Sequence, residues 1–130
     1  LNLNIFQDKK ADTIILCSSK RFSRSQTHTC EYIPIKEKDK KLSIKHILQS
    51  LGKEGVTSIL VEGGYEVLRS FFKEDFIDQI YIYTSDHDIE NATLKNPIIL
   101  TEDWEILDEI SLGKDQLIMA EKGVECLQEL

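Results

Sequence analysis

Cysteine, proline and long apolar runs are scarce in this sequence of 130 residues, and the shortages exclude whole classes of protein. The three cysteines, Cys17, Cys30 and Cys126, are odd in number and far apart, which argues against a disulfide framework and for reduced thiols. No apolar run approaches the roughly 18 to 20 residues that cross a bilayer, and no charged-then-apolar leader opens the sequence. We therefore expect a cytoplasmic protein that has no membrane partner.

Positive charge is also in short supply. Lysine and arginine number 16 against 23 aspartate and glutamate residues, which gives a net charge of −7. A broad positive surface for nucleic acid needs the opposite balance, so we expect no nucleic-acid partner and only local contacts with phosphate. Cysteine and histidine form no pair of elements spaced for tetrahedral ligation, and we expect no metal site.

Short apolar or alternating runs predict the strands. They lie at residues 13–17, 31–35, 56–61, 78–84 and 98–100, followed by a hairpin that joins 105–112 to 116–120. The first run should be a central strand buried on both faces, and Pro34 should keep the second at an edge of the sheet. The third run carries the strongest strand pattern in the chain. Residues 36–41, in contrast, read as a solvated run of charges.

Two helices are predicted between these strands. Apolar residues at helical spacing follow Ser43, a candidate N-cap, and Gly52 should end this first helix. The second helix should run from about residue 65 to residue 73 and bury Val67, Leu68 and Phe71. Strands that alternate with helices imply parallel strands joined by right-handed crossovers. The sequence thus predicts one α/β domain over its whole length, with a mixed, mostly parallel sheet flanked by helices and a C-terminal antiparallel hairpin.

Glu62, Gly63 and Gly64 directly follow the strongest predicted strand and open the second helix. Ligands of parallel α/β sheets bind at this end of a strand. Two glycines leave the backbone open to a ligand, and the free N–H groups of a helix's first turn favour an anion such as a pyrophosphate. The same pair would suit a tight turn that needs glycine for its own dihedral angles, and spacing alone does not decide between the two interpretations.

A longer segment carries a family resemblance. Residues 55–64 (GVTSILVEGG), the apolar residues of the second helix and residues 76–81 (FIDQIY) resemble the C-terminal half of the reductase domain in the riboflavin-biosynthesis deaminase/reductase family. More distantly, residues 14–19 (IILCSS) are similar to the strand and serine pair of dihydrofolate reductases. The resemblance implies a dihydrofolate reductase-like fold. Because the reductase domains of this family are longer, we expect the chain to be the C-terminal part of one and inactive alone.

The resemblance also implies roles for eight residues. The pyrophosphate of NADPH would be lined, mainly by backbone N–H groups, by Gly63, Gly64, Tyr65 and Glu66. Glu62 would help to hold the substrate, unless its carboxylate only caps the adjacent turn. The adenosine 2′-phosphate would lie near Ser18, Ser19 and Lys20, since hydroxyls and a cation suit an oxyanion. A solvated loop charge is the alternative for Lys20.

The family reduces 5-amino-6-(5-phosphoribosylamino)uracil to its ribityl product with hydride from NADPH. The resemblance therefore implies an oxidoreductase of riboflavin biosynthesis with a phosphorylated pyrimidine substrate. Because the cofactor carries the chemistry, we expect no catalytic side chain and no covalent nucleophile. The HxE and PCxxC zinc signature of the fused deaminase does not occur in this sequence, which excludes deamination by this chain.

An alternative function is a non-catalytic binding or dimerisation module on the same scaffold. The expected loss of the N-terminal half and the acidic, glycine-free segment 85–90 favour it, whereas the intact Glu62-Gly63-Gly64 favours the enzyme. A sheet that lacks a neighbouring strand would expose an edge and apolar area. We therefore expect a homodimer, with the C-terminal hairpin as the region that mediates it.

Overall fold

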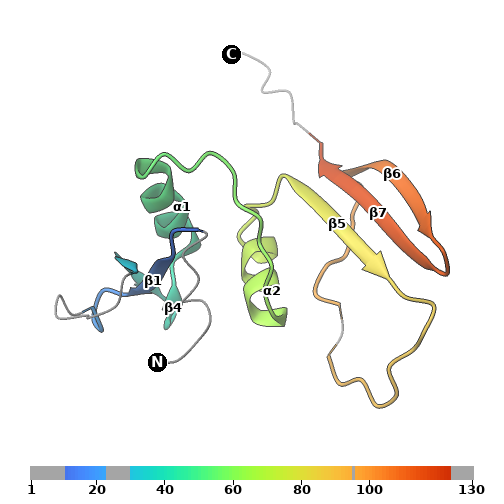
Figure 1. Ribbon diagram of the computed structural model, residues 1–130, viewed down its shortest axis with the longest axis horizontal. Coiled ribbons are helices and arrows are strands. Elements are labelled where there is room, and N and C mark those ends of the chain that lie inside the picture. Colours follow the sequence, from blue (N-terminus) through green and yellow to red (C-terminus); the bar gives the residue numbers. More distant parts are fainter. Residues whose placement is uncertain (1–10, 23–29, 95, 124–130) are drawn as a thin grey trace. The chain divides into compact units, whose positions relative to one another are not determined.

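The computed structural model describes residues 11–22, 30–94 and 96–123, which form a mixed α/β structure. The chain divides into two compact units, Leu1–Leu60 and Val61–Leu130. One helix lies in each unit, α1 (Ile44–Lys53) in the first and α2 (Tyr65–Lys73) in the second (Figure 1). The single domain predicted for the whole chain stays a prediction.

The first unit is built on a parallel pair of strands, β1 (Ile14–Ser18) and β2 (Glu31–Ile35). Both strands occur where the sequence predicts them. β1 was expected to be central, but β2 is its one neighbour among the described residues, and most of its side chains are only half-buried. The pairing places Ser18, the last residue of β1, opposite Ile35, the last residue of β2.

A short antiparallel hairpin follows, formed by β3 (Glu37–Lys38) and β4 (Lys41–Leu42). Asp39 and Lys40 connect the strands with φ angles of 52° and 63°. Two consecutive left-handed residues form the type I′ turn, whose twist matches that of the strands it joins. The charged run at 36–41 is exposed, as predicted, and it also forms this hairpin, because the turn forms here without glycine.

Helix α1 confirms the predicted helix start but not its end. The Ser43 hydroxyl accepts a hydrogen bond from the N–H of His46 at 3.3 Å, so Ser43 is the N-cap. The buried face of α1 presents Ile44 and Ile47. The helix continues through Gly52 to Lys53, and the left-handed backbone that ends it belongs to Gly55, with a φ of 85°.

The second unit contains a three-stranded antiparallel sheet in the order β5-β7-β6 (Figure 1). Its strands are β5 (Gln79–Thr84), β6 (Trp104–Leu112) and β7 (Asp115–Lys122). As predicted, β6 and β7 form a hairpin, which turns at Gly113 with a φ of 74°. The buried side chains of this unit are Phe71, Ile80, Leu117 and Ala120.

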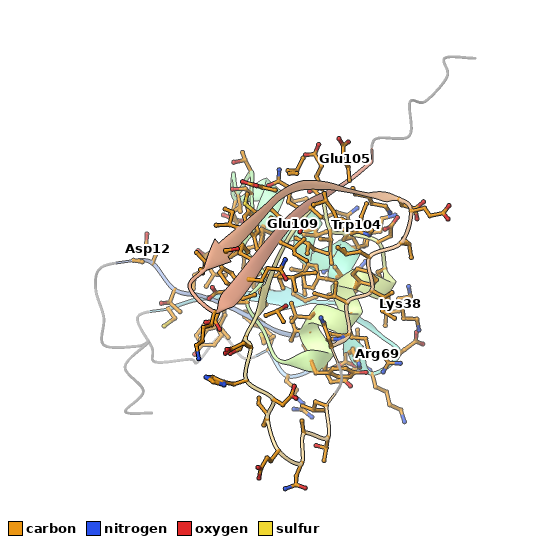
Figure 2. The ribbon with its side chains drawn as sticks, turned by 90° about the vertical axis from the view of Figure 1, so that its right-hand side faces the viewer. Asp12, Lys38, Arg69, Trp104, Glu105 and Glu109 are labelled. Atoms are coloured by element: carbon orange, nitrogen blue, oxygen red, sulfur yellow. The ribbon has the colours of Figure 1, made fainter. Side chains whose placement is uncertain are left out.

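Three contacts connect the hairpin to the end of α2 and the segment that follows it. The rings of Phe72 and Trp104 stack with centroids 6.2 Å apart and planes 8° from parallel. Trp104 opens β6, as Figure 2 shows. Lys122, the last residue of β7, forms an ion pair with Asp75, and its N–H donates to the carbonyl of Asp78 at 2.9 Å. The hairpin is thus held to the segment between α2 and β5.

The strongest predicted strand, 56–61, is not a strand in the structure. Its one backbone hydrogen bond among the described residues joins the N–H of Val56 to the carbonyl of Leu51 at 3.1 Å. Leu60 is 78% exposed. β propensity alone does not hold a strand when no neighbouring strand pairs with its backbone. The predicted strand at 98–100 is absent for the same reason.

Without a strand at 56–61, most of the strand pairs described are antiparallel. Among the described residues β1 and β2 form the one parallel pair, and the other three strand pairs are antiparallel, so the mostly parallel sheet is not observed. Helix α2 has the predicted bounds, but it buries Phe71 while Val67 remains 46% exposed.

Ile35 gives a test of the first unit's core, because its side chain is fully buried. Replacing it with alanine should lower the free energy of unfolding by about 2 to 5 kcal/mol, through lost burial and the cavity left behind. Ile89→Ala is the control, since Ile89 is 81% exposed, and it should have little effect. Urea unfolding followed by circular dichroism measures both variants. Equal losses would contradict the assigned core.

Candidate functional site

The end of β1 brings three predicted site residues into one tight turn. The N–H of Ser19 donates to the carbonyl of Ile35 at 2.9 Å and continues the parallel pairing past the strand. The N–H of Lys20 donates to the hydroxyl of Ser18 at 3.2 Å, and the N–H of Arg21 donates to the Ser18 carbonyl at 2.9 Å. Ser18 is buried, whereas Ser19 and Lys20 are exposed. The turn therefore presents a hydroxyl and an ammonium group side by side.

Glu37 occupies this pair of donors, and sequence reasoning missed it. The Ser18 hydroxyl donates to Oε1 of Glu37 at 2.5 Å, and the Lys20 ammonium donates to Oε2 at 2.7 Å. Together these hydrogen bonds hold the pKa of Glu37 below its ordinary value, and the bond from Lys20 has the larger effect, followed by the bond from Ser18. In the sequence Glu37 is one acid in a run of charges. Only the pairing of Ser18 with Ile35 places it beside Lys20.

The start of α2 offers backbone donors. Gly64 is the N-cap, and its carbonyl accepts from the N–H groups of Val67 at 3.0 Å and Leu68 at 3.3 Å. Among the described residues, no hydrogen-bond acceptor is found for the N–H groups of Gly64 and Tyr65. Unpaired N–H groups at a helix start suit an anion. This end of α2 can therefore donate to an oxyanion from its backbone.

The side chains around the start of α2 are largely accessible. Glu62 and Glu66 are exposed, and Tyr65 is half-buried. The guanidinium carbon of Arg69 lies 5.9 Å from the centroid of the Tyr65 ring, a cation–π contact on the surface of the helix. Glu66 stabilises the first turn through the helix dipole, but its charge would repel an anion there. The backbone, rather than the Glu66 side chain, is the part that suits a phosphate.

Gly63 and Gly64 differ in whether packing excludes a side chain at their position. A Cβ atom on Gly63 would lie 2.8 Å from Cβ of Val67, so packing within the protein excludes a side chain there. A Cβ atom on Gly64 would have no atom within 4 Å. The Gly64 φ of −68° and ψ of 171° are open to any residue. Neither packing nor dihedral angles explain the glycine at 64, and its bare backbone fits the close approach of a ligand.

The predicted site residues fall into two groups in different units. Ser18, Ser19 and Lys20 belong to the first unit, and residues 62–66 belong to the second. That both groups serve one ligand stays a prediction. Two cavities among the described residues of the second unit are lined by Asp75, Trp104 and Lys122, among others, and none of the eight predicted residues lines either of them.

Within residues 11–22, 30–94 and 96–123, no cluster of histidine, cysteine and acidic side chains could hold a metal ion. Cys17 and Cys30 are free thiols, and Cys126 lies outside the described residues. None of the described helices is long and apolar enough to cross a membrane.

Comparison with known proteins identifies the family. The model of the RibD C-terminal domain family matches residues 1–85 of this chain. The match covers more than half of the chain, which therefore belongs to this family of reductase domains. It includes both groups of site residues and Glu37, whereas β6 and β7 lie beyond it. Membership implies a dihydrofolate reductase-like fold, and reductases of this family typically use NADPH. No curated protein matches the chain.

The difference between the two glycines can be tested with one substitution at each. Gly63→Ser should lower the free energy of unfolding by about 1 to 3 kcal/mol, because the new Cβ collides with Val67. Gly64→Ser should change it by less than about 0.5 kcal/mol or stabilise the protein slightly, since serine is a favourable N-cap. Urea unfolding measures both. A larger loss for Gly64→Ser than for Gly63→Ser would show that the assignment is wrong.

Proposed function

We propose that this chain belongs to an NADPH-dependent reductase of riboflavin biosynthesis, which reduces 5-amino-6-(5-phosphoribosylamino)uracil to its ribityl product. Membership of the RibD C-terminal domain family supports the class of reaction. The observation that carries the coenzyme assignment is Gly64, whose open backbone at the start of α2 has no explanation in packing or dihedral angles.

In this proposal the chain binds and orients, and NADPH supplies the hydride when it is bound. The N–H groups of Gly64 and Tyr65 would donate to the pyrophosphate oxygens, with Gly63 allowing the close turn and Glu66 exposed beside it. The positive end of the α2 dipole would favour the same charge. Glu62 is exposed just before this turn, and its carboxylate would accept hydrogen bonds from the sugar hydroxyls of the substrate. Ser18, Ser19 and Lys20 would face the adenosine end of the coenzyme.

A non-catalytic module on the same scaffold is the second candidate. The acidic, glycine-free segment 85–90 favours it, because carboxylates repel a phosphate. Asp86 has its own partners there, His87 at 3.4 Å and Lys114 at 3.8 Å. Binding of a nicotinamide coenzyme, NADPH or NADH, distinguishes the two candidates, since only the enzyme requires it.

Calorimetric titration with NADPH tests the reductase. The chain should bind NADPH with a dissociation constant in the micromolar to millimolar range, and Gly64→Arg should weaken binding by more than about tenfold by filling the space at the backbone. Gly52→Arg is the matched control, because a Cβ there also meets no atom within 4 Å, but on α1. Equal binding by all three proteins would refute the pyrophosphate position. No binding of NADPH or of NADH by the unmodified chain would favour the non-catalytic module.

We also propose that the chain forms a homodimer through its C-terminal hairpin. Among the described strands β6 is an edge strand of nine residues, with an unpaired row of backbone groups on its outer side. Exposed edges of this length pair readily with a second chain. Ile110 and Leu112 add apolar area to the edge, with exposed fractions of 36% and 47%.

Sedimentation velocity over a dilution series tests the dimer. The chain should sediment as a dimer at high concentration, and Leu112→Lys should shift it toward monomer by placing a charge at the β6 edge. Leu94→Lys adds the same charge at a site that is 71% exposed and outside the sheet, and it should leave the dimer intact. A monomer at every concentration would contradict the proposal.

A further inference from the structure

The end of β1 already holds an oxyanion of its own. Both carboxylate oxygens of Glu37 are bound, one by the Ser18 hydroxyl at 2.5 Å and the other by the Lys20 ammonium at 2.7 Å. These are two of the three residues that the family resemblance assigns to the adenosine 2′-phosphate. The donors do recognise an anion, but the anion that occupies them belongs to the protein.

The fold builds Glu37 into this position. Ile35, two residues before it, is fully buried and pairs with Ser18, and its carbonyl accepts from the N–H of Ser19 at 2.9 Å. Glu37 itself pairs with Leu42 in the hairpin that the type I′ turn closes. Backbone pairing of Ile35 with Ser18 and of Glu37 with Leu42 therefore fixes where the carboxylate lies. Its side chain is 24% exposed, whereas that of Lys20 is 78% exposed.

The charges of Glu37 and Lys20 determine which coenzyme group can bind at the end of β1. Glu37 is ionised at neutral pH, as its lowered pKa requires, so its charge offsets that of Lys20. A 2′-phosphate carries about two negative charges, and it would have to displace the carboxylate or lie beside it. A free 2′-hydroxyl can instead donate a hydrogen bond to the carboxylate, as ribose hydroxyls do to acidic residues in NAD sites.

We infer that Glu37 is a specificity-determining residue that weakens binding of the coenzyme 2′-phosphate and shifts the preference of this reductase from NADPH toward NADH. The inference rests on the proposed function, because it assumes that the coenzyme binds with its adenosine end at the end of β1. It concerns selection between two coenzymes rather than the reaction they support. Glu37 acts on the coenzyme through its own charge and through its hold on Ser18 and Lys20.

Binding of NADPH and NADH to the chain and to Glu37→Gln tests this inference. The unmodified chain should favour NADPH over NADH by less than about tenfold. Glu37→Gln keeps the size of the side chain and frees Lys20, so NADPH should bind about tenfold more tightly while NADH changes by less than about twofold. The adenosine fragments 2′,5′-ADP and 5′-AMP should follow the same pattern. Destabilisation of the variant would weaken the binding of all ligands together, so the quantity to compare is the ratio of the NADPH and NADH affinities.

Two further variants sharpen the test. Glu31→Gln removes the same charge from the opposite end of β2, where Glu31 pairs with Ile14, and it should leave the NADPH to NADH ratio unchanged. Adding Lys20→Ala to Glu37→Gln should remove the gain for NADPH and leave NADH as it was.

The outcomes separate the two proposals. If both dinucleotides bind and the ratio is the same with and without Glu37, or already favours NADPH by about tenfold, the role of Glu37 is refuted and the reductase stands. If neither dinucleotide nor fragment binds to any variant, the coenzyme assignment fails and the role of Glu37 fails with it.

Discussion

Backbone pairing is the constraint on which the described structure depends. A strand keeps its form only where a neighbouring backbone satisfies its N–H and C=O groups. β1 and β2 satisfy each other along one side, and β7 does so for both β5 and β6. The segment 56–61 has the strongest β propensity of the chain but finds no such neighbour among the described residues. Pairing, rather than propensity, thus decides which runs become strands.

Features that depend on neighbouring residues were therefore predictable from the sequence. Ser43 and the apolar spacing after it place the start of α1, and Gly113 marks the turn of the C-terminal hairpin. Features that depend on distant residues or on backbone angles were not. Gly52 and Gly55 are both glycines near the end of α1, and only the left-handed φ of Gly55 shows which one follows the helix. The turn at Asp39 and Lys40 lacks glycine and so gives no sequence signal.

The candidate site, too, was predictable only where it depends on neighbouring residues. The family resemblance grouped Ser18, Ser19 and Lys20, which the structure places at the end of a strand, and local pattern placed the glycine pair at the start of a helix. It could not separate the two glycines, because the contact that excludes a side chain at Gly63 comes from Val67, one helical turn away. That contact explains Gly63 by packing, and packing gives no explanation for Gly64.

Glu37 shows that one neighbouring side chain can determine which anion a serine–lysine motif binds. The chain carries a net charge of −7, so the attraction of a phosphate depends on a few local cations rather than on the field of the whole protein. Salt screens charges beyond about 10 Å at 0.1 M ionic strength, which makes the nearest charges decisive at an exposed site. At the end of β1 the Lys20 ammonium is one such cation, and Glu37 already pairs with it at 2.7 Å. A serine pair followed by a lysine therefore indicates an anion site, but the register of β1 with β2 determines whether a coenzyme phosphate or the protein's own carboxylate fills it.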